Sequence, residues 1–315
     1  MAITSEFRYS PSHWVPFRDA REAERVRGIR RDQITKHPNG NFRIQVLSDA
    51  EIAFARILDL FARIKESDEQ NSRLVLILPN PHPQYVRLAA IINRFRVSCR
   101  NLYIFNMDEW ADEDGHEAPE TWSRGFMHAM KNNFLKRLDA DLRPPEDHIQ
   151  GPTRKNIERY GQMIEDVGGA DLCDGGIGWS GHIAFVDPGA PEFGGPFEEW
   201  KAMGPRLVTL NPFTLAQTCI DADFGMSGDW TWVPPRAYTI GPRQILEARL
   251  RNSWNHFCIA STDISWQRFS VRLAMHGPVC KECPASILQI GPTNMYLSEA
   301  IAANIEEHDE TLFYS

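Results

Sequence analysis

The acidic pair Asp108 and Glu109 directly follows an apolar stretch, NLYIFNM, at 101–107. A carboxylate at the end of a buried strand is partly removed from water, which raises its pKa towards the neutral range in which a general base works. Asp108 is therefore the candidate base for moving a proton. A helix N-cap or a surface acid would leave the same pattern, so the spacing alone does not decide between these roles.

A second group of polar side chains lies in the loop GGIGWSGHIAFVDP at 175–188. His182 is the candidate acid–base group of this loop, and Asp187 could hold its ring in one tautomer. A histidine hydrogen-bonded for structural reasons alone is the alternative. The glycines would let backbone N–H groups approach a ligand oxygen. The other candidate substrate-binding residues of the loop are Gly175, Gly176, Gly178, Trp179, Ser180 and Ala184.

A third polar segment follows the apolar stretch LVLIL at 74–78 and contains Pro79, Asn80 and His82. Ligands of open α/β sheets bind beyond the carboxyl ends of the parallel strands. These three residues, together with Glu109, complete the set of candidate substrate-binding residues.

The elements that must position these residues alternate between short apolar runs and segments of helical periodicity. Such alternation predicts an α/β protein with a mainly parallel, doubly wound sheet. Helical periodicity predicts helices at 52–64, 85–95 and 121–138. The predicted strands are 42–46, 74–79, 101–107, 169–178, 207–210, 237–241, 256–261 and 285–291. Residues 1–40 are polar and aperiodic, so we expect an N-terminal extension followed by one domain over 41–315.

Composition narrows the class of protein. The 34 basic and 42 acidic side chains give a formal charge of −8, which argues against a general nucleic-acid or anionic-membrane surface. No apolar run approaches the roughly 20 residues of a membrane span, and the N-terminus lacks the apolar core of a signal peptide. Six cysteines are too few for a disulfide scaffold, so a cytoplasmic protein is expected. Cys280 and Cys283 form a C-x-x-C without the second pair that a zinc site needs, so no metal is predicted.

Three motifs in one order resemble the glucosamine-6-phosphate deaminase/isomerase family: FNMDEW at 105–110, PETWSRGFMHAMKNNFL at 119–135, and the loop at 175–188. The resemblance runs from about Phe42 to about Ile305. It implies a Rossmann-like three-layer α/β/α fold and isomerisation of an aldose to a ketose coupled to loss of ammonia. By the same resemblance, Asp108 would move a proton between sugar C2 and C1. His182, oriented by Asp187, would assist opening of the sugar ring, with no cofactor.

The sequence departs from the family pattern at four places. Ser180 stands where the family has an aspartate, and a serine cannot stabilise an imidazolium by its charge. The family binds the sugar phosphate with an L-P-[TS]-G-G-T-P loop, an arginine and a lysine. Here the loop is LPNPHP at 78–83, Ile220 aligns with the arginine, and Asp263 aligns with the lysine. A phosphate dianion needs several charge-assisted donors, so we expect a substrate that the usual 6-phosphate site does not anchor.

The expected partner is therefore a sugar or amino sugar, with neither nucleic acid nor membrane involved. A sugar lactone hydrolase and a non-catalytic sugar-binding or regulatory protein on the same fold are the alternatives. Trp179 would stack on a sugar face or fill the core, and the sequence favours neither. Members of the family often form oligomers, which leaves a homo-oligomer open.

Overall fold

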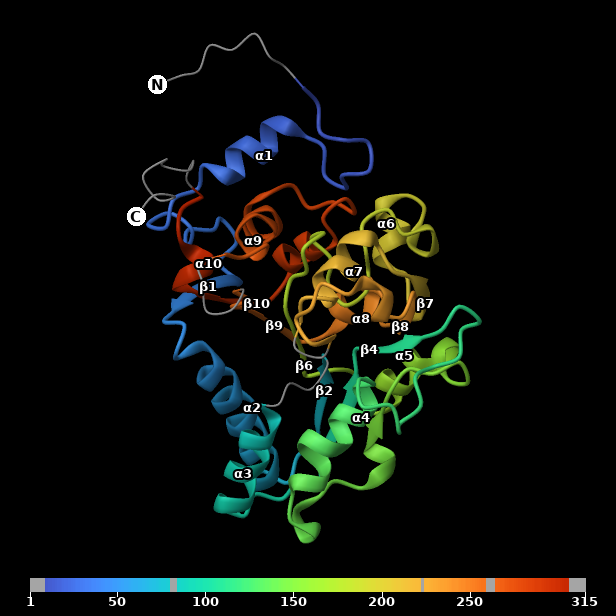
Figure 1. Cartoon of the computed structure of the whole chain (residues 1–315). Coiled ribbons are helices and arrows are strands. Elements are labelled where there is room, and N and C mark those ends of the chain that lie inside the picture. Colours follow the sequence, from blue (N-terminus) through green and yellow to red (C-terminus); the bar gives the residue numbers. More distant parts are fainter. Residues whose placement is uncertain (1–8, 80–83, 222–223, 259–263, 306–315) are drawn as a thin grey trace.

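A seven-stranded parallel sheet forms the centre of the molecule (Figure 1). The computed structural model describes residues 9–79, 84–221, 224–258 and 264–305. The strands lie in the order β1-β10-β9-β6-β2-β3-β5, and every pairing between neighbours is parallel. Their bounds are β1 Phe42–Leu47, β2 Leu74–Leu78, β3 Leu102–Asn106, β5 Ile149–Gln150, β6 Leu172–Gly175, β9 Leu250–Asn255 and β10 Thr293–Ser298.

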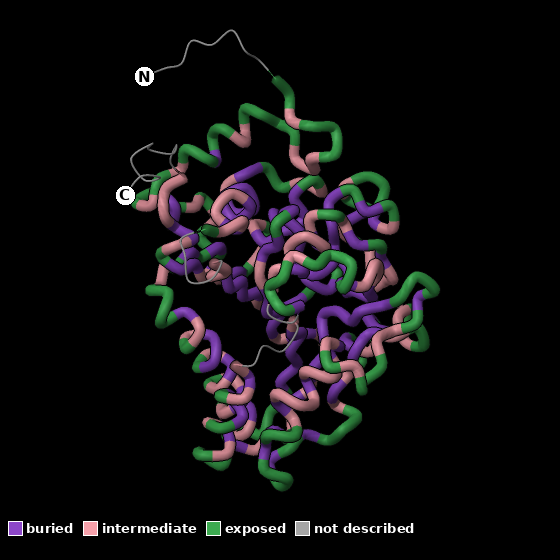
Figure 2. Tube along the Cα trace, viewed as in Figure 1, coloured by how far each residue is buried: buried purple, intermediate pink, exposed green. Residues whose placement is uncertain are grey.

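Two hydrophobic cores cover the two faces of this sheet. Side chains of a strand point alternately to opposite faces, and β2 follows this rule: Leu76 joins the core under α2 and α3, whereas Val75 and Ile77 join the other core. The second core receives α5, α8 and α9, so the fold has three layers, α/β/α. Figure 2 shows buried residues gathered along the central strands. The main helices are α2 Ile52–Glu69, α3 Tyr85–Phe95, α5 Ile157–Asp166, α8 Pro242–Glu247 and α9 Gln267–His276. The predicted α/β class and parallel sheet are confirmed.

A second, smaller sheet was not predicted. It contains three antiparallel strands in the order β4-β8-β7, with bounds β4 Asp108–Ala111, β7 Arg206–Thr209 and β8 Arg236–Thr239. The apolar runs at 207–210 and 237–241 are strands, but they belong to this sheet. Short apolar runs do not reveal which sheet a strand joins.

Three predicted elements differ from the structure near the C-terminus and in the middle of the chain. The run at 285–291 is a 3-10 helix, η9 Pro284–Ile290, and the strand follows it as β10. The strand predicted at 256–261 is displaced, because β9 ends at Asn255; residues 259–261 lie outside the described part of the chain. The helix predicted at 121–138 begins only at Phe126.

The reason for the displaced strand is visible in its composition. β9 buries Arg251, Asn252 and Ser253, polar residues that resemble a loop in sequence but have partners in the structure.

The predicted helix at 121–138 divides into α4 Phe126–Ala129, η1 Met130–Phe134 with π-helical geometry, and η2 Leu135–Arg137. The remaining short helices are η3 Ala140–Leu142, η4 Glu146–His148, η5 Pro191–Phe193, α6 Phe197–Lys201, α7 Pro212–Thr218, η7 Trp230–Trp232 and α10 Glu299–Ala302.

The N-terminal segment packs on the helical layer beside α9. Helix α1 Ala20–Arg27 starts at Asp19, whose carboxylate accepts hydrogen bonds from two backbone N–H groups of the first turn. Val26 and Ile34 are fully buried in the larger core. The polar composition of residues 1–40 therefore conceals two core positions. No helix in the described part of the chain has the length and apolar character to cross a membrane.

Candidate active site

Asp108 lies where the chain passes from the large sheet to the small one. Its carboxylate is almost fully buried and accepts a 3.3 Å hydrogen bond from the backbone N–H of Phe185. Burial raises the pKa of Asp108 to about 7; hydrogen bonds from Thr239 and Phe185 and the charge of His182 act in the opposite direction. A carboxyl group with a pKa near neutrality can both take up and return a proton.

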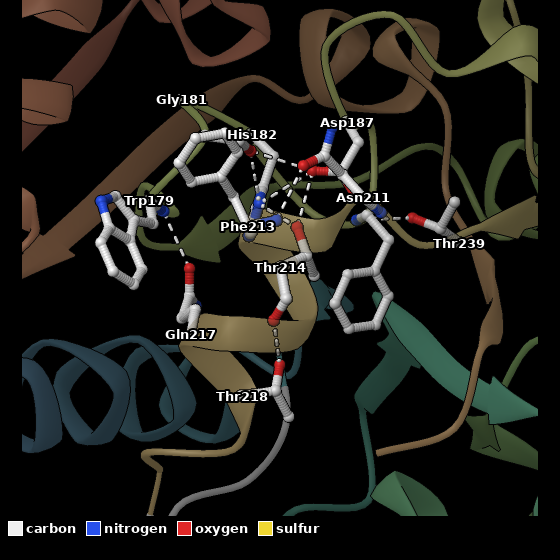
Figure 3. A network of polar contacts seen from close by, with 12 residues as sticks. Trp179, Gly181, His182, Asp187, Asn211, Phe213, Thr214, Gln217, Thr218 and Thr239 are labelled. Carbon is white, nitrogen blue, oxygen red and sulfur yellow. Dashed lines mark hydrogen bonds and ion pairs between the residues drawn. The ribbon is translucent and has the colours of Figure 1, made fainter. Parts of the chain in front are cut away.

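His182 is held by three groups on one side of its ring (Figure 3). Its Nδ1 lies 3.2 Å from an oxygen of Asp187, 3.0 Å from the hydroxyl of Ser180 and 2.9 Å from the hydroxyl of Thr214. Both hydroxyls also donate to the same oxygen of Asp187, at 2.9 and 2.7 Å. Because each hydroxyl has one proton, and each gives it to Asp187, both can only accept from Nδ1. Nδ1 therefore carries a hydrogen, and in the neutral ring Nε2 is the free base.

The buried carboxylate of Asp187 is stabilised in its charged form. Burial alone would raise the pKa of Asp187, but the charge of His182 and hydrogen bonds from His182, Asn211 and Thr214 outweigh burial and lower the pKa. The second oxygen accepts the backbone N–H of Asn211 at 3.0 Å. Asp187 thus remains ionised and able to orient and stabilise a protonated imidazole.

The glycines of the loop make room for neighbouring protein atoms. A Cβ added at Gly178 would lie 2.0 Å from Nε2 of His182, and one at Gly176 would lie 2.9 Å from the carbonyl oxygen of Trp254. Gly175 ends β6, where an added Cβ would approach Met107. The absence of a side chain at Gly178 is therefore explained by the histidine ring. The assignment of all three as substrate-binding residues stays a prediction.

Ala184 adopts a left-handed backbone conformation, with φ of 52°. This region is unfavourable for residues with a Cβ, and such residues concentrate where the surrounding structure forces them. Here the conformation turns the chain so that the next residue, Phe185, directs its N–H at Asp108 and at the hydroxyl of Thr239. Ala184 is thus placed to position the candidate base.

Glu109 is engaged by backbone groups. One oxygen accepts the N–H groups of Trp110 and Phe126, and the other accepts that of Met127 at 2.8 Å. The last two N–H groups belong to the first turn of α4, so the side chain caps this helix. Burial raises the pKa of Glu109 to about 7, although these hydrogen bonds act against it. Its prediction as a substrate-binding residue stays untested, and its contacts favour a positioning role.

Trp179 and Pro79 lie at the edges of the candidate site. Trp179 is 39% exposed, and its backbone N–H donates to the side chain of Gln217. Pro79 follows β2 and is half-buried. Asn80 and His82, and with them the loop expected to replace the phosphate loop, lie outside the described residues, as does Asp263.

Three polar residues around the candidate pair escaped the sequence analysis: Thr214, Asn211 and Thr239. Asn211 and Thr214 begin α7, where the Asn211 side chain accepts the N–H of Phe213 as an N-cap. The N-cap pattern Asn-Pro before an apolar turn marks this helix start in sequence. Nothing in the sequence indicates that the helix lies against His182.

A fully buried ion pair lies below the same edge of the sheet. Arg56 of α2 contacts Asp174 of β6 at 2.7 Å, and the indole N–H of Trp254 donates to the other oxygen of Asp174. The positive charge of Arg56 is thereby matched by a carboxylate. Asp174 stands directly before the glycine loop, so this pair anchors the end of β6 and adds no net charge to the site.

The described residues contain no cluster of three or more histidine, cysteine, aspartate or glutamate side chains suited to a metal ion. Cys280 and Cys283 are free thiols. Burial raises the pKa of Cys280 to about 11 and that of Cys283 further. Both are therefore protonated and weakly nucleophilic near neutral pH.

Comparisons with known proteins find relatives in sequence. The chain is 34% identical over 194 residues to glucosamine-6-phosphate deaminase of Caenorhabditis elegans, covering 59% of this chain and 65% of that protein. It is 30% identical over 207 residues to glucosamine-6-phosphate deaminase of Dictyostelium discoideum, and this match covers 64% of this chain and 69% of that protein. No protein-family model matches the chain.

Solved structures show the same fold. A monomeric glucosamine-6-phosphate deaminase matches with a TM-score of 0.64 at 20% identity, covering 83% of this chain and 98% of its own. A 6-phosphogluconolactonase from Leishmania guyanensis matches with a TM-score of 0.57 at 12% identity, and the match covers 84% of this chain and 98% of the lactonase. Both a deaminase and a lactonase have this fold, so the fold does not distinguish the two families. The relatives at 30% identity or more are deaminases. The match spans about two thirds of the length of these curated relatives. The chain belongs to the glucosamine-6-phosphate deaminase family.

Proposed function

We propose that the protein isomerises an aldose to a ketose, with release of ammonia when the substrate is an amino sugar. The observation that carries this proposal is the pairing of a buried carboxyl group of pKa about 7, Asp108, with a histidine fixed by an ionised Asp187. The two groups are close enough for the charge of His182 to lower the pKa of Asp108. Aldose–ketose conversion needs two such groups, one for carbon and one for oxygen protons.

His182 would act first, on the closed sugar ring. With Nδ1 protonated and held towards Asp187, Nε2 can take the proton of the anomeric hydroxyl and return it to the ring oxygen as the ring opens. The imidazolium formed in between is stabilised by the Asp187 carboxylate. The hydroxyls of Ser180 and Thr214 orient both partners. Asp187 thus supplies the charge that the serine at position 180 cannot supply.

Asp108 would act on the open chain. Its ionised carboxylate removes the proton from C2 while water gives a proton to the aldehyde oxygen at C1, which leaves an enediol or an enolamine. The resulting carboxylic acid returns its proton to C1 as the hydroxyl at C2 gives up a proton to water, which leaves a ketose. With an amino sugar the product is an imine at C2, and water releases ammonia and leaves a ketose. Hydrogen bonds from the backbone N–H of Phe185 and from the hydroxyl of Thr239 hold this carboxylate in position.

The substrate that we propose is a sugar or amino sugar that the family's usual 6-phosphate contacts do not hold. Ile220, which aligns with the family's arginine, is half-buried and carries no charge. Arg56, a buried cation below the site, is already matched by Asp174. These two observations support a weak requirement for phosphate.

The test compares purified wild-type protein with Asp108→Asn on glucosamine, glucosamine 6-phosphate and glucose, measuring ammonia and ketose. We expect turnover of an unphosphorylated substrate and a loss of about 10²- to 10⁴-fold in kcat for the variant, the usual contribution of a general base. Equal turnover by both proteins would refute the role of Asp108. Turnover of glucosamine 6-phosphate alone would refute the altered substrate. Consumption of a sugar lactone without ketose formation would identify a hydrolase.

A further inference from the structure

A row of aromatic side chains lies at the surface beside the candidate active site. It consists of Trp14, Phe213, Trp179, Trp266 and Phe257. The ring centroids are 5.6 Å apart for Trp14 and Phe213, 6.0 Å for Phe213 and Trp179, 6.4 Å for Trp179 and Trp266, and 4.9 Å for Trp266 and Phe257. The row joins four segments that are distant in sequence, and its first member comes from the N-terminal segment.

Two rings of the row are exposed although they are large and apolar, and the other three are half-buried. Trp14 is 63% exposed and Trp179 is 39% exposed. A tryptophan that filled the core would be covered, so Trp179 is no core residue. Contiguous exposed aromatic surface at the mouth of a site is typical of ligand binding.

The neighbours of Trp179 fix its orientation. Trp266 lies nearly parallel to it, at 18°, and Phe213 meets it edge to face, at 68°. Its backbone N–H donates to Gln217, one turn after Phe213 on α7. A side chain supported from two sides loses little freedom when a ligand stacks on it, which favours binding.

Helix α7 connects the row with the acid–base residues. Thr214 of this helix points to His182 and Asp187, while Phe213 and Gln217 contact the indole ring or backbone of Trp179. Figure 3 shows Trp179 directed away from the contact between His182 and Asp187. The indole therefore lies to one side of the contact between His182 and Asp187.

We propose that Trp179 and its aromatic neighbours form a subsite that stacks on the apolar C–H face of an unphosphorylated sugar ring, with Trp14 of the N-terminal segment extending that surface. The inference rests on the proposed function, because it takes the ligand to be the sugar on which Asp108 and His182 act. It supplies an anchor of a different chemistry from a phosphate: a flat aromatic surface that binds the ring itself.

The test uses methyl β-glucosaminide, whose blocked anomeric carbon prevents ring opening and isomerisation. Calorimetry would measure its Kd for wild type, Trp179→Ala, Trp179→Phe and Trp14→Ala. We expect about tenfold weaker binding for Trp179→Ala, as one lost aromatic contact implies, and a Kd near wild type for Trp179→Phe. Trp14→Ala should weaken binding about two- to threefold, because it lies at the outer end of the row.

The matched control is Trp230→Ala, which removes a 70% exposed tryptophan of η7 outside the row. It should leave the Kd unchanged. An equal Kd for wild type and Trp179→Ala, or no binding by wild type at all, would overturn the subsite.

The two proposals fail in different experiments. Glycoside binding that depends on Trp179, without turnover of any sugar, would leave the subsite standing and refute the isomerase. Turnover that depends on Asp108, with glycoside binding indifferent to Trp179, would refute only the subsite.

Discussion

The proposed base, Asp108, lowers the stability of the folded protein in its ionised form, because the charged carboxylate is buried. Its pKa in the folded protein is about 7, against about 3.9 for an unfolded aspartate. Between these values the folded state holds a proton that the unfolded state has released. The free energy of unfolding therefore falls as the pH rises from about 4 to about 7, and the cost is complete above that range.

Asp108→Asn, which carries no charge, should be more stable than wild type by about 2 to 4 kcal/mol near pH 8 and equally stable near pH 4. Urea unfolding of both proteins at the two pH values measures this difference. A variant less stable than wild type at both would contradict the raised pKa. The activity of wild type should fall as the pH drops below about 7, because protonation removes the base.

Thr214 should matter for catalysis through the orientation of His182. Thr214→Val keeps the shape of the side chain but removes the donor to Asp187 and the acceptor for Nδ1. We expect kcat to fall about tenfold or more, with a stability loss of about 1 to 3 kcal/mol for the unpaired buried oxygen. Thr218→Val, one turn later, loses only a bond to a helix carbonyl and serves as the control. Equal kcat values for the two variants would refute the orienting role.

The candidate residues could be named from sequence because their types and positions after apolar runs are local features. Asp108, His182 and Asp187 do lie around one site. Thr214 could not be named, because its role depends on α7 packing against loop residues that lie 27 and 32 residues earlier in the chain. The capping role of Glu109 could not be predicted either, because its partners in α4 lie 17 and 18 residues further along the chain.

The loop after β6 is shaped by the residues that it must accommodate. Gly178→Ala would place a methyl group 2.0 Å from Nε2 of His182, so the ring could not keep its observed position. We predict a loss of activity comparable to that of removing His182, with the fold retained. Activity assays together with circular dichroism would check this.

Gly40→Ala is the matched control for that substitution, because a Cβ there meets no atom within 4 Å. Wild-type activity in the Gly178 variant would mean that the histidine ring does not need its observed position.

Elements differed in how well sequence identified them. β2 and β3 are continuous apolar runs and were found within one or two residues, since both faces of these strands are buried. The strand predicted near β9 was placed too late in the chain because β9 itself buries arginine, asparagine and serine. The arginine and the asparagine have partners in another strand and in helices. η9 resembles a strand because its residues are apolar, yet it is a 3-10 helix packed against α9.

At the scale of the whole molecule, one buried arginine joins the segment after α1 and the end of α10 to α9. The guanidinium of Arg272 in α9 has five N–H donors and makes five bonds to carbonyl oxygens. One acceptor is Ile29, after α1, and three belong to residues 301–303 at the end of α10. Burial, with a contribution from Arg268, lowers the pKa of Arg272 to about 10, which still leaves it charged at neutral pH.

Arg272→Met should therefore destabilise the protein by about 3 kcal/mol or more, because several buried carbonyls lose their partner. Arg268→Met, which loses one bond to Ala300, is the control and should cost less than about 1 kcal/mol. Thermal unfolding measures both. Similar melting temperatures for the two variants would show that Arg272 does not hold the segment after α1 and the end of α10 in place.

The junction between the two sheets has a mechanical consequence. Only Met107 separates β3, in the large sheet, from β4, in the small one, and Asp108 comes directly after it. A rigid body that tilts about a pivot displaces its distant parts most and those at the pivot least. Tilting of the small sheet about Met107 would carry β7 through a wide arc and leave the carboxylate of Asp108 nearly stationary. Of all the residues of the small sheet, the candidate base would therefore be displaced least by such a motion.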